Sequence, residues 1–293
     1  MAGAAGLRAL LRNEAMVVAP GAYDGLTAKL VAQAGFAAVY MTGAGTSVSR
    51  GYPDFGLLTM SEMVENAACI VRSVDVPVIA DADTGYGNEL NAFRTVQEYE
   101  ARGVAAIHIE DQVSPKKCGH LDDKEIVPRE DYIAKIRAAV AARRSGDFMI
   151  IARTDARAVA GLDEAVARAN AALSAGADMA FVEAPQTMDE LAAVPKRVAG
   201  PCLLNVVRGG KTPEIDLRRA QDMGYRLAIV PGLLLKAVIG ACDEVLAELR
   251  ATQVHPVPRR DMTVREAFGR VGADEWDALR TRFRGEPERR AAE

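Results

Sequence analysis

The sequence predicts a (β/α)8 barrel, and three observations lead to this fold class. Short apolar segments alternate with helical patterns eight times along the chain, as in a closed parallel barrel. The length of 293 residues accommodates eight such units and an extension, because a barrel of this kind takes about 250 residues. Several predicted helices are followed directly by glycine, the residue expected at a left-handed helix end.

The alternative is an open doubly wound sheet, which is also built from strand–helix units. No glycine-rich dinucleotide fingerprint follows the first predicted strand. The segment Gly43-Ala44-Gly45 has two of the required glycines and lacks the third. The barrel is therefore the favoured fold.

The individual elements follow from local composition. Each predicted strand is short, continuous and apolar or β-branched, which suits a strand buried on both faces of a parallel sheet. The predicted strands are residues 16–19, 37–42, 76–80, 105–109, 148–152, 179–182, 202–207 and 227–230. The predicted helices include residues 26–34, 61–73, 92–101, 129–142, 162–175 and 217–223, with Gly35, Gly103, Gly176 and Gly224 at helix ends.

The end of the chain does not continue the repeat. After a predicted helix at 233–251 comes the proline-containing linker 254–258, which places the domain boundary between a catalytic barrel, 1–252, and a helical extension, 253–293. Two amphipathic helices are expected at 263–268 and 273–283, and a partner subunit is a plausible place for their apolar faces. The charged segment 285–293 is expected to fray.

Composition excludes several classes of protein. The formal net charge of −4 and the aromatic content of 5% argue against a nucleic-acid surface. No stretch of about 18 uncharged apolar residues occurs, so no membrane span is expected. Four scattered cysteines without a C-x-x-C pair argue against a zinc knuckle and a disulfide framework, and predict a cytoplasmic protein with reduced thiols.

Polar residues follow the predicted strands at their carboxyl ends, where barrel enzymes carry their active sites. The alternative, that each polar residue merely caps its strand, would have to hold for five strands at once. The residues at these ends are Tyr40, Thr42, Gly43, Ala44, Asp81, Asp83, His108, Glu110, Asp111, Arg153, Asp155, Glu183 and Asn205. One shared polar site is therefore predicted.

Three of these side chains predict a metal site. Asp81, Asp83 and Glu110 offer hard oxygen ligands without histidine or cysteine, which favours Mg²⁺, or Mn²⁺, over zinc. Such a cation would polarise a bound hydroxy or keto acid and stabilise a developing enolate. Arg153 is the natural partner of a substrate carboxylate, with an ion pair to Asp155 as the structural alternative.

The segment after the fourth strand is long and polar and contains one thiol, Cys118. Lys116, Lys117 and His120 flank this thiol, and positive neighbours lower a thiol pKa, so an exposed and reactive cysteine is expected on a loop that closes over substrate and delivers a proton. The alternatives are a buried inert cysteine and a nucleophile. The latter ranks low because no Cys–His–Asn order supports it.

Together these motifs resemble the isocitrate lyase and phosphoenolpyruvate mutase superfamily over nearly the whole chain. The matching segments are Pro20-Gly21-Ala22-Tyr23-Asp24, Tyr40-Met41-Thr42-Gly43, Pro53-Asp54-Phe55-Gly56, Asp81-Ala82-Asp83-Thr84-Gly85-Tyr86-Gly87, His108-Ile109-Glu110-Asp111-Gln112, Lys116-Lys117-Cys118-Gly119-His120, Ala152-Arg153-Thr154-Asp155-Ala156, and Asn205 with Gly210-Lys211-Thr212-Pro213. The resemblance implies a Mg²⁺-dependent barrel that acts on 2-oxo or 2-hydroxy acids through an enolate. It also implies a homotetramer with swapped C-terminal helices.

The resemblance also implies roles for individual residues. Asp81 would bind the metal directly, with Asp83 and Glu110 acting through water, and Asp54 would support the metal and the substrate oxygen. Cys118 would be the catalytic acid, and Arg153 would bind the substrate carboxylate. The other implied substrate-binding residues are Tyr40, Thr42, Gly43, Ala44, His108, Lys117, Gly119, His120, Glu183 and Asn205. The expected partner is a small carboxylate substrate.

The cysteine loop resembles that of the carbon–carbon lyases, which cleave isocitrate, 2-methylisocitrate or dimethylmalate. A phosphonomutase of the carboxyphosphonoenolpyruvate type, an oxaloacetate decarboxylase and a catalytically silent binding protein are the alternatives. Where methylisocitrate lyases carry a threonine and an acid, this chain has Val207 and Arg208. Loss of a hydrogen bond to a charged substrate costs roughly 1.5–3 kcal/mol, which favours a substituted malate over a tricarboxylate.

Overall fold

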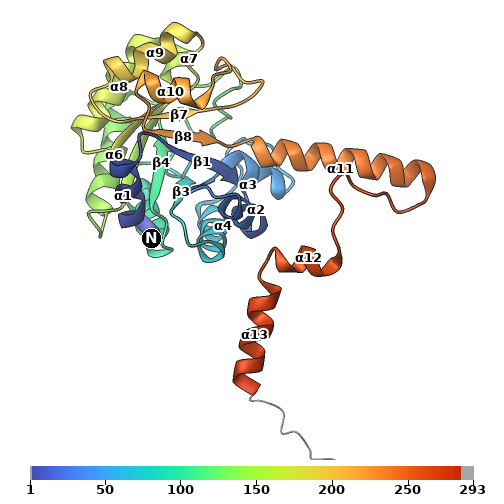
Figure 1. Ribbon diagram of the computed structural model, residues 1–293. Coiled ribbons are helices and arrows are strands. Elements are labelled where there is room, and N and C mark those ends of the chain that lie inside the picture. Colours follow the sequence, from blue (N-terminus) through green and yellow to red (C-terminus); the bar gives the residue numbers. More distant parts are fainter. Residues whose placement is uncertain (1, 285–293) are drawn as a thin grey trace, which may run out of the picture. The chain divides into compact units, whose positions relative to one another are not determined.

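A computed structural model describes residues 2–284, and it contains a closed barrel of eight parallel strands in sequential order (Figure 1). The predicted fold class is thus confirmed. The strands are β1 (Val17–Ala22), β2 (Val39–Met41), β3 (Val78–Asp81), β4 (Ala106–Glu110), β5 (Met149–Thr154), β6 (Met179–Val182), β7 (Cys202–Asn205) and β8 (Leu227–Val230). Pairing of Val17 with Leu227 closes the barrel between β1 and β8.

Helices precede, connect and follow the strands along the chain. They are α1 (Gly3–Asn13), α2 (Gly25–Gln33), α3 (Gly43–Ser49), α4 (Met60–Ser73), α5 (Glu89–Ala101), α6 (Arg129–Ala142), α7 (Ala156–Ala160), α8 (Leu162–Ser174), α9 (Met188–Arg197), α10 (Leu217–Met223), α11 (Leu233–Thr252), α12 (Val264–Gly269) and α13 (Ala273–Arg284). Polar caps start many of them: Thr59, for example, accepts from the backbone N–H of Glu62, whose carboxylate reaches back to Thr59. The predicted glycine ends are confirmed, as at Gly224 with φ of 106°.

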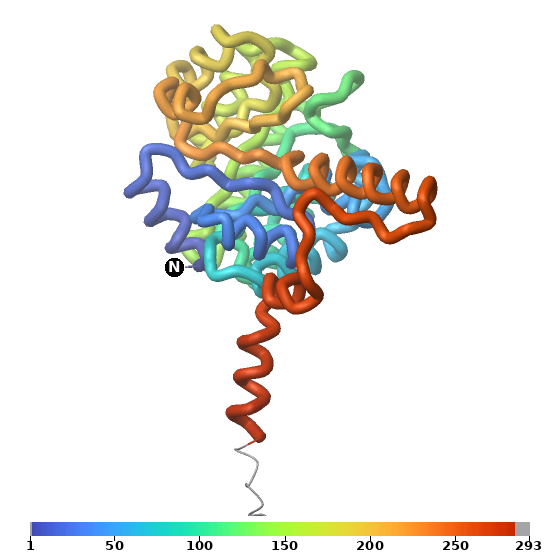
Figure 2. Tube along the Cα trace, turned by 45° about the vertical axis from the view of Figure 1, so that its right-hand side comes forward, coloured from blue at the N-terminus to red at the C-terminus, as the bar shows by residue number. Residues whose placement is uncertain are grey.

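Side chains alternate in direction along each strand, and those that point inward fill the barrel interior. Ile79, Ile151 and Phe181 belong to one buried cluster, and Leu7 of α1 belongs to the same cluster. Figure 2 shows α1, at the start of the chain, beside the barrel. Helix α1 therefore contributes to the barrel core, although the sequence pattern of residues 1–14 did not predict a helix there.

Helix α3 was not among the predicted helices either. Its residues are mostly glycine, serine and threonine, which have weak helix propensity. The side chain of Thr42 stabilises its first turn by accepting from the N–H of Gly45. This local capping, together with burial, compensates for the poor propensity and places the helix directly after β2.

The chain divides into two compact units between Ala237 and Val238, a position within α11. The predicted boundary after residue 252 is the end of this helix. Helices α12 and α13 match the predicted helices at 263–268 and 273–283, and the predicted fraying of 285–293 lies outside the described residues.

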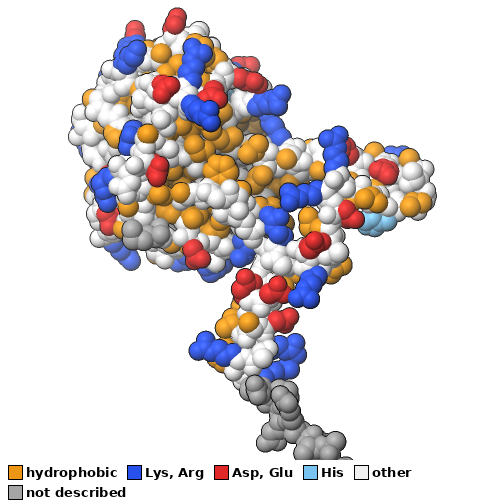
Figure 3. All heavy atoms as spheres, in the orientation of Figure 1, with side chains coloured by type: hydrophobic (Ala, Val, Ile, Leu, Met, Phe, Trp, Pro, Cys, Tyr) orange, Lys and Arg blue, Asp and Glu red, His pale blue; other side chains and the backbone are white. Residues whose placement is uncertain are grey.

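No side chain of α11, α12 or α13 is buried in this chain. Trp276 is 72% exposed and Phe283 is 78% exposed, and Figure 3 shows hydrophobic side chains at the surface of this segment. Among residues 2–284, no helix has the length and apolar character needed to cross a membrane.

Candidate active site

The predicted polar residues meet at a cavity of about 200 Å³ at the carboxyl ends of the strands. The ends of β2, β3, β5 and β7, the loop after β4 and the start of α11 all contribute to its wall. The cavity is lined by Tyr40, Thr42, Ala44, Asp54, Asp81, Cys118, Gly119, His120, Arg153, Asn205, Val207, Pro231, Gly232, Leu235 and Lys236. Most of the residues proposed from sequence thus share one space.

Tyr40, Asp81 and His108 form a buried cluster at the base of the cavity. The Tyr40 hydroxyl lies 2.8 Å from His108 Nε2 and 3.4 Å from Asp81 Oδ2, and His108 Nε2 lies 3.6 Å from Asp81 Oδ1. Burial lowers the pKa of His108 to about 4, so the imidazole is neutral at pH 7. Burial and the Asp81 charge raise the pKa of Tyr40, which keeps its hydroxyl proton.

Asp81 itself remains ionised. Burial alone would raise the pKa of Asp81, but the positive charges of His108, Lys116 and Arg153 outweigh it and lower the pKa to about 2. His108 is neutral at pH 7 but protonated below about pH 4, so its charge is present where Asp81 titrates. Asp81 Oδ1 also accepts from the N–H of Asp83 at 3.0 Å. A carboxylate is therefore available at the end of β3.

Lys116 connects the loop after β4 to two further carboxylates. Its ammonium group lies 2.5 Å from Asp54 Oδ1 and 2.9 Å from Asp83 Oδ1. Burial alone would lower the pKa of Lys116, but Asp83 and Asp54 raise it well above its ordinary value. Asp83 has a positive φ of 46°, an uncommon conformation for a residue with a side chain and one that clusters at functional sites.

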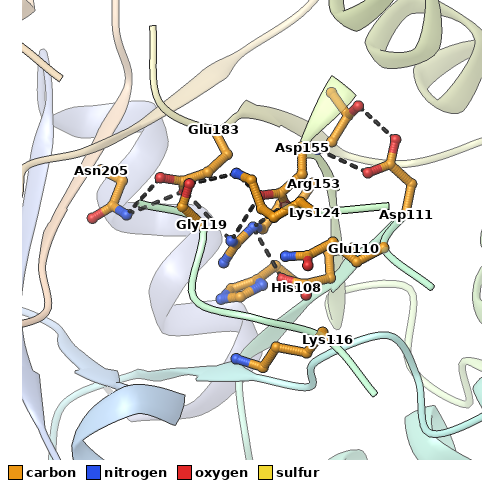
Figure 4. A network of polar contacts seen from close by, with 12 residues as sticks. His108, Glu110, Asp111, Lys116, Gly119, Lys124, Arg153, Asp155, Glu183 and Asn205 are labelled. Carbon is orange, nitrogen blue, oxygen red and sulfur yellow. Dashed lines mark hydrogen bonds and ion pairs between the residues drawn. The ribbon is translucent and has the colours of Figure 1, made fainter. Parts of the chain in front are cut away.

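Arg153 lies among three carboxylates from neighbouring strand ends (Figure 4). Its Nε atom donates to Asp155 Oδ2 at 2.9 Å and lies 3.1 Å from Glu110 Oε2 without hydrogen-bond alignment; its NH2 group lies 3.8 Å from Glu183 Oε2. The guanidinium also lies 5.1 Å from the centre of the Phe181 ring. Arg153 therefore forms the ion pair with Asp155 and also lines the cavity, so both roles considered for it are compatible with the structure.

Glu183, His120 and Asn205 form the opposite side of the site. His120 Nδ1 accepts from the backbone N–H of Lys211 at 3.0 Å, so Nε2 carries the proton and faces Glu183 Oε1 at 3.0 Å. Asn205 Nδ2 donates to Glu183 Oε2 at 3.1 Å. The amide oxygen of Asn205 is buried and has no donor, which leaves an acceptor for a ligand hydroxyl.

The close approach of the Asp81 side chain explains why a glycine, Gly43, follows β2. A Cβ atom at Gly43 would collide with the carboxylate of Asp81. Thr42 and Ala44 line the cavity on either side of Gly43. The N–H of Gly45 already donates to the Thr42 side chain, and the other first-turn N–H groups of α3, which have no partners within the helix, are potential donors to a substrate oxygen.

The electrostatic expectation for Cys118 is wrong. Burial, followed by the negative charge of Asp54, raises the pKa of Cys118 to about 11. The flanking lysines do not lower it, because Lys116 pairs with Asp54 and Asp83 and Lys117 Nζ donates to the carbonyl of Asp123. The partly buried Cys118 is therefore a protonated thiol at pH 7, the form required of an acid.

This pKa predicts a specific pH dependence for alkylation. Because only the thiolate reacts with iodoacetamide, the rate at Cys118 is expected to rise about tenfold per pH unit between pH 7 and 10. Peptide mass spectrometry measures the rate, and the exposed Cys69 controls for reagent quality. A plateau below pH 8 would contradict a raised pKa.

The acidic residues fit a hard divalent cation, although not as a set of direct ligands. Both carboxylate oxygens of Glu110 are buried without a hydrogen-bond donor. Within residues 2–284, no three His, Cys, Asp or Glu side chains converge closely enough to hold a metal ion together. Magnesium retains several waters and prefers oxygen ligands, so one direct carboxylate and further carboxylates acting through water are compatible with this geometry.

Not every proposed site residue faces the cavity, and some cavity residues were not proposed as site residues. The Lys117 side chain points to the carbonyl of Asp123 and lies outside the cavity wall. The other proposed site residues that do not line the cavity are Gly43, Asp83, His108, Glu110 and Glu183. Pro231, Gly232, Leu235 and Lys236 line the cavity but follow a strand, β8, that ends without an ionisable residue. The presence of polar strand ends could not identify them, and the position of β8 in the closed barrel was the only available signal.

Comparison with known proteins places this chain among enzymes. Residues 7–250 match the family model described as phosphoenolpyruvate phosphomutase. The chain is 52% identical over 229 residues to 2,3-dimethylmalate lyase of Eubacterium barkeri, covering 78% of this chain and 79% of that protein. It is 46% identical over 243 residues to 2-methylisocitrate lyase of Aeropyrum pernix, covering 83% of this chain and 78% of that protein.

Comparison with solved structures leads to the same group of enzymes. The crystal structure of a 2,3-dimethylmalate lyase matches with a TM-score of 0.93 and 41% identity, covering 100% of this chain and 99% of the other. A phosphonopyruvate hydrolase in complex with oxalate and Mg²⁺ matches with a TM-score of 0.88 and 34% identity, covering 97% and 100%. The predicted class of carbon–carbon lyase agrees with the names of the lyases among these relatives. The chain belongs to the phosphoenolpyruvate phosphomutase family of the isocitrate lyase and phosphoenolpyruvate mutase superfamily.

Proposed function

We propose that this protein is a Mg²⁺-dependent carbon–carbon lyase that cleaves a 2-hydroxy di- or tricarboxylate into a 2-oxo acid and a second carboxylate. The observation that carries the proposal is a protonated thiol, Cys118, in the same cavity as Arg153 and the ionised Asp81. This arrangement combines an acid, a carboxylate-binding cation and an anionic metal ligand. The dimethylmalate and methylisocitrate lyases among the relatives support the same reaction class.

In this proposal Arg153 binds the carboxylate of the 2-hydroxy acid, and Tyr40, Thr42, Gly43 and Ala44 hold the adjoining oxygens. Asp81 would bind Mg²⁺, or Mn²⁺, directly, with Asp83 and Glu110 acting through water. When bound, the cation would supply positive charge beside the substrate oxygens. The Mg²⁺ in the phosphonopyruvate hydrolase structure supports the choice of metal.

Acid and base groups of this chain supply the proton transfers of the cleavage step. A base among Asp54 and the carboxylates near Tyr40 accepts the 2-hydroxyl proton, and the C2–C3 electron pair moves to the second fragment as C2 becomes a carbonyl. Cys118 donates its S–H proton to the resulting aci-carboxylate carbon. The thiolate then regains a proton before the next turnover.

The cavity wall favours a substituted malate as the substrate. Val207 and Leu235 give the cavity an apolar side, which suits an alkyl substituent at C2 or C3. Lys236 lies at the same cavity, where its ammonium donates to the carbonyl of Arg208 at 2.6 Å and has two further N–H donors for a distal carboxylate. A dicarboxylate with an alkyl group satisfies both features.

A substrate panel tests this function. Release of a 2-oxo acid is measured with 2,3-dimethylmalate, citramalate, 2-methylisocitrate, isocitrate and oxaloacetate, each with and without Mg²⁺. The highest kcat/KM is expected for an alkyl malate, with loss of activity in EDTA. Turnover confined to oxaloacetate would contradict the lyase assignment. Phosphorus NMR of a phosphonate substrate would detect a phosphonomutase instead.

We also propose that α11 to α13 exchange between subunits of a homotetramer, because none of their side chains is buried in the isolated chain. Trp276→Asp is expected to reduce the oligomer mass measured by light scattering, since a charge disfavours burial of this face. Asp277→Asn, on the same helix, is the control and should leave the mass unchanged. A wild-type monomer would contradict the proposal. A cytoplasmic location remains a prediction.

A further inference from the structure

Lys124 is buried in a stretch of loop that is otherwise exposed. Leu121 is 44% exposed, whereas Lys124 is 8% exposed. This is the reverse of ordinary burial, in which an ammonium stays in water and a leucine does not. A buried ammonium costs free energy unless charged and polar partners compensate for the lost water, so its partners indicate its role.

Lys124 has two partners, one on the barrel and one on its own loop. Its ammonium lies 2.7 Å from Asp155 Oδ1 and also donates to the carbonyl oxygen of Gly119 (Figure 4). Gly119 directly follows Cys118. The ammonium therefore joins the backbone next to the thiol to a carboxylate just beyond the end of β5.

Asp155 is a fixed point for this contact. Its N–H donates to Asp111 Oδ1 at 2.8 Å, and Asp111 also accepts from Thr154 at 2.6 Å and from Arg168 at 3.1 Å. These contacts, with partners from β5 and α8, attach the backbone of Asp155 to the barrel and not to the loop. The same carboxylate accepts from Arg153, so one group orients both the loop and the carboxylate-binding guanidinium.

Other contacts of the loop give it little apolar support. The loop encloses a cavity of about 180 Å³, lined by Gln112, Val113, Ser114, Pro115, Lys117, Asp123, Lys124 and Glu125. Gly119 packs so closely on Arg153 and Glu183 that a Cβ atom there would collide with both side chains. The position of the Cys118 backbone thus depends on polar contacts, with the Lys124 contact among the most buried.

We propose that Lys124 is a positioning residue that, through Asp155, holds the Cys118 loop against the Arg153 side of the cavity. Lys124 does not line the cavity and therefore acts through the loop and Asp155. The inference deepens the proposed function, on which its catalytic consequence rests. Its structural consequence, protection of Cys118 from solvent, can be measured whatever the reaction is.

The test compares Lys124→Met, Lys124→Gln and Lys124→Arg with wild type. Iodoacetamide alkylation of Cys118 is followed by peptide mass spectrometry at pH 8. Lys124→Met and Lys124→Gln are expected to raise the rate at Cys118 at least about tenfold, because loss of one partner of a buried ion pair is strongly destabilising. Lys124→Arg retains the charge and should retain most of the protection.

Two controls separate loop opening from unfolding and from general charge effects. Cys202 in β7 is 1% exposed, so alkylation of this thiol identifies a variant that has unfolded. Lys211→Met removes two exposed contacts to the same loop, at Asp122 and at the carbonyl of Leu121, and should change the Cys118 rate less than about twofold. If Lys124→Met unfolds, Lys124→Gln decides the result.

Kinetics provide the second readout. With a substrate that wild type cleaves, Lys124→Met is expected to lower kcat about 100-fold and to change KM less than about threefold, because the acid is misplaced while Arg153 remains. Unchanged Cys118 alkylation in a folded Lys124→Met or Lys124→Gln variant would overturn the proposal. If wild type cleaves none of the panel, the proposed function fails, whereas increased alkylation would still support the positioning role.

Discussion

Replacing Cys118 with alanine is expected to lower kcat by about 10²–10⁴-fold, the contribution typical of a positioned acid or base. The thiol is partly buried in the cavity wall, and burial raises its pKa to about 11, so nearly every molecule carries the proton at pH 7. Alanine cannot donate a proton. Binding of Mg²⁺ and oxalate is expected to persist, since Asp81 and Arg153 are unchanged.

Stopped-flow or steady-state kinetics with the best panel substrate measure kcat, and calorimetry measures oxalate affinity in the presence of Mg²⁺. Cys69→Ala is the matched control, because Cys69 is exposed on α4. Cys118→Ser should be nearly as inactive as alanine, since an alcohol is a much weaker acid than a thiol. Near-normal turnover in Cys118→Ala would rule out the thiol as the acid.

Sequence could predict the carboxylate cluster because parallel strands bring their carboxyl ends to one rim. The register of adjacent strands determines which residues lie side by side: Glu110 of β4 pairs with Arg153 of β5, and Asp81 of β3 pairs with His108 of β4. Once the strands are located, these contacts follow from the fold alone. This is why strand-end residues from β2 to β7 share a single site.

Side-chain direction in the loop could not be predicted in the same way. Sequence proximity places Lys116 and Lys117 beside Cys118, and this proximity predicted a lowered thiol pKa. In the structure Lys116 reaches Asp54 and Asp83, while Asp54 lies near enough to the thiol to raise its pKa further. Long-range contacts, not adjacent residues, determine the charge around this group.

Substitution of Arg153 is expected to have the other large effect, and two replacements separate its two roles. Arg153 is buried among Asp155, Glu110 and Glu183, whose charges raise its pKa well above the ordinary value against the effect of burial. Arg153→Met leaves these carboxylates without their cation. Removal of one partner of a buried pair costs about 3–5 kcal/mol of folding free energy, so thermal unfolding should occur at a clearly lower temperature.

Arg153→Lys retains the positive charge but loses the planar pair of donors that fits a carboxylate. Its stability should lie closer to wild type, while kcat/KM is expected to fall about 10–100-fold, equivalent to about 1.5–3 kcal/mol for a hydrogen bond to a charged group. Chemical denaturation and kinetics on the same preparation distinguish the two effects. A stable and fully active Arg153→Lys variant would show that charge alone binds the substrate, whereas a stable Arg153→Met variant would show that the surrounding carboxylates are protonated and need no cation.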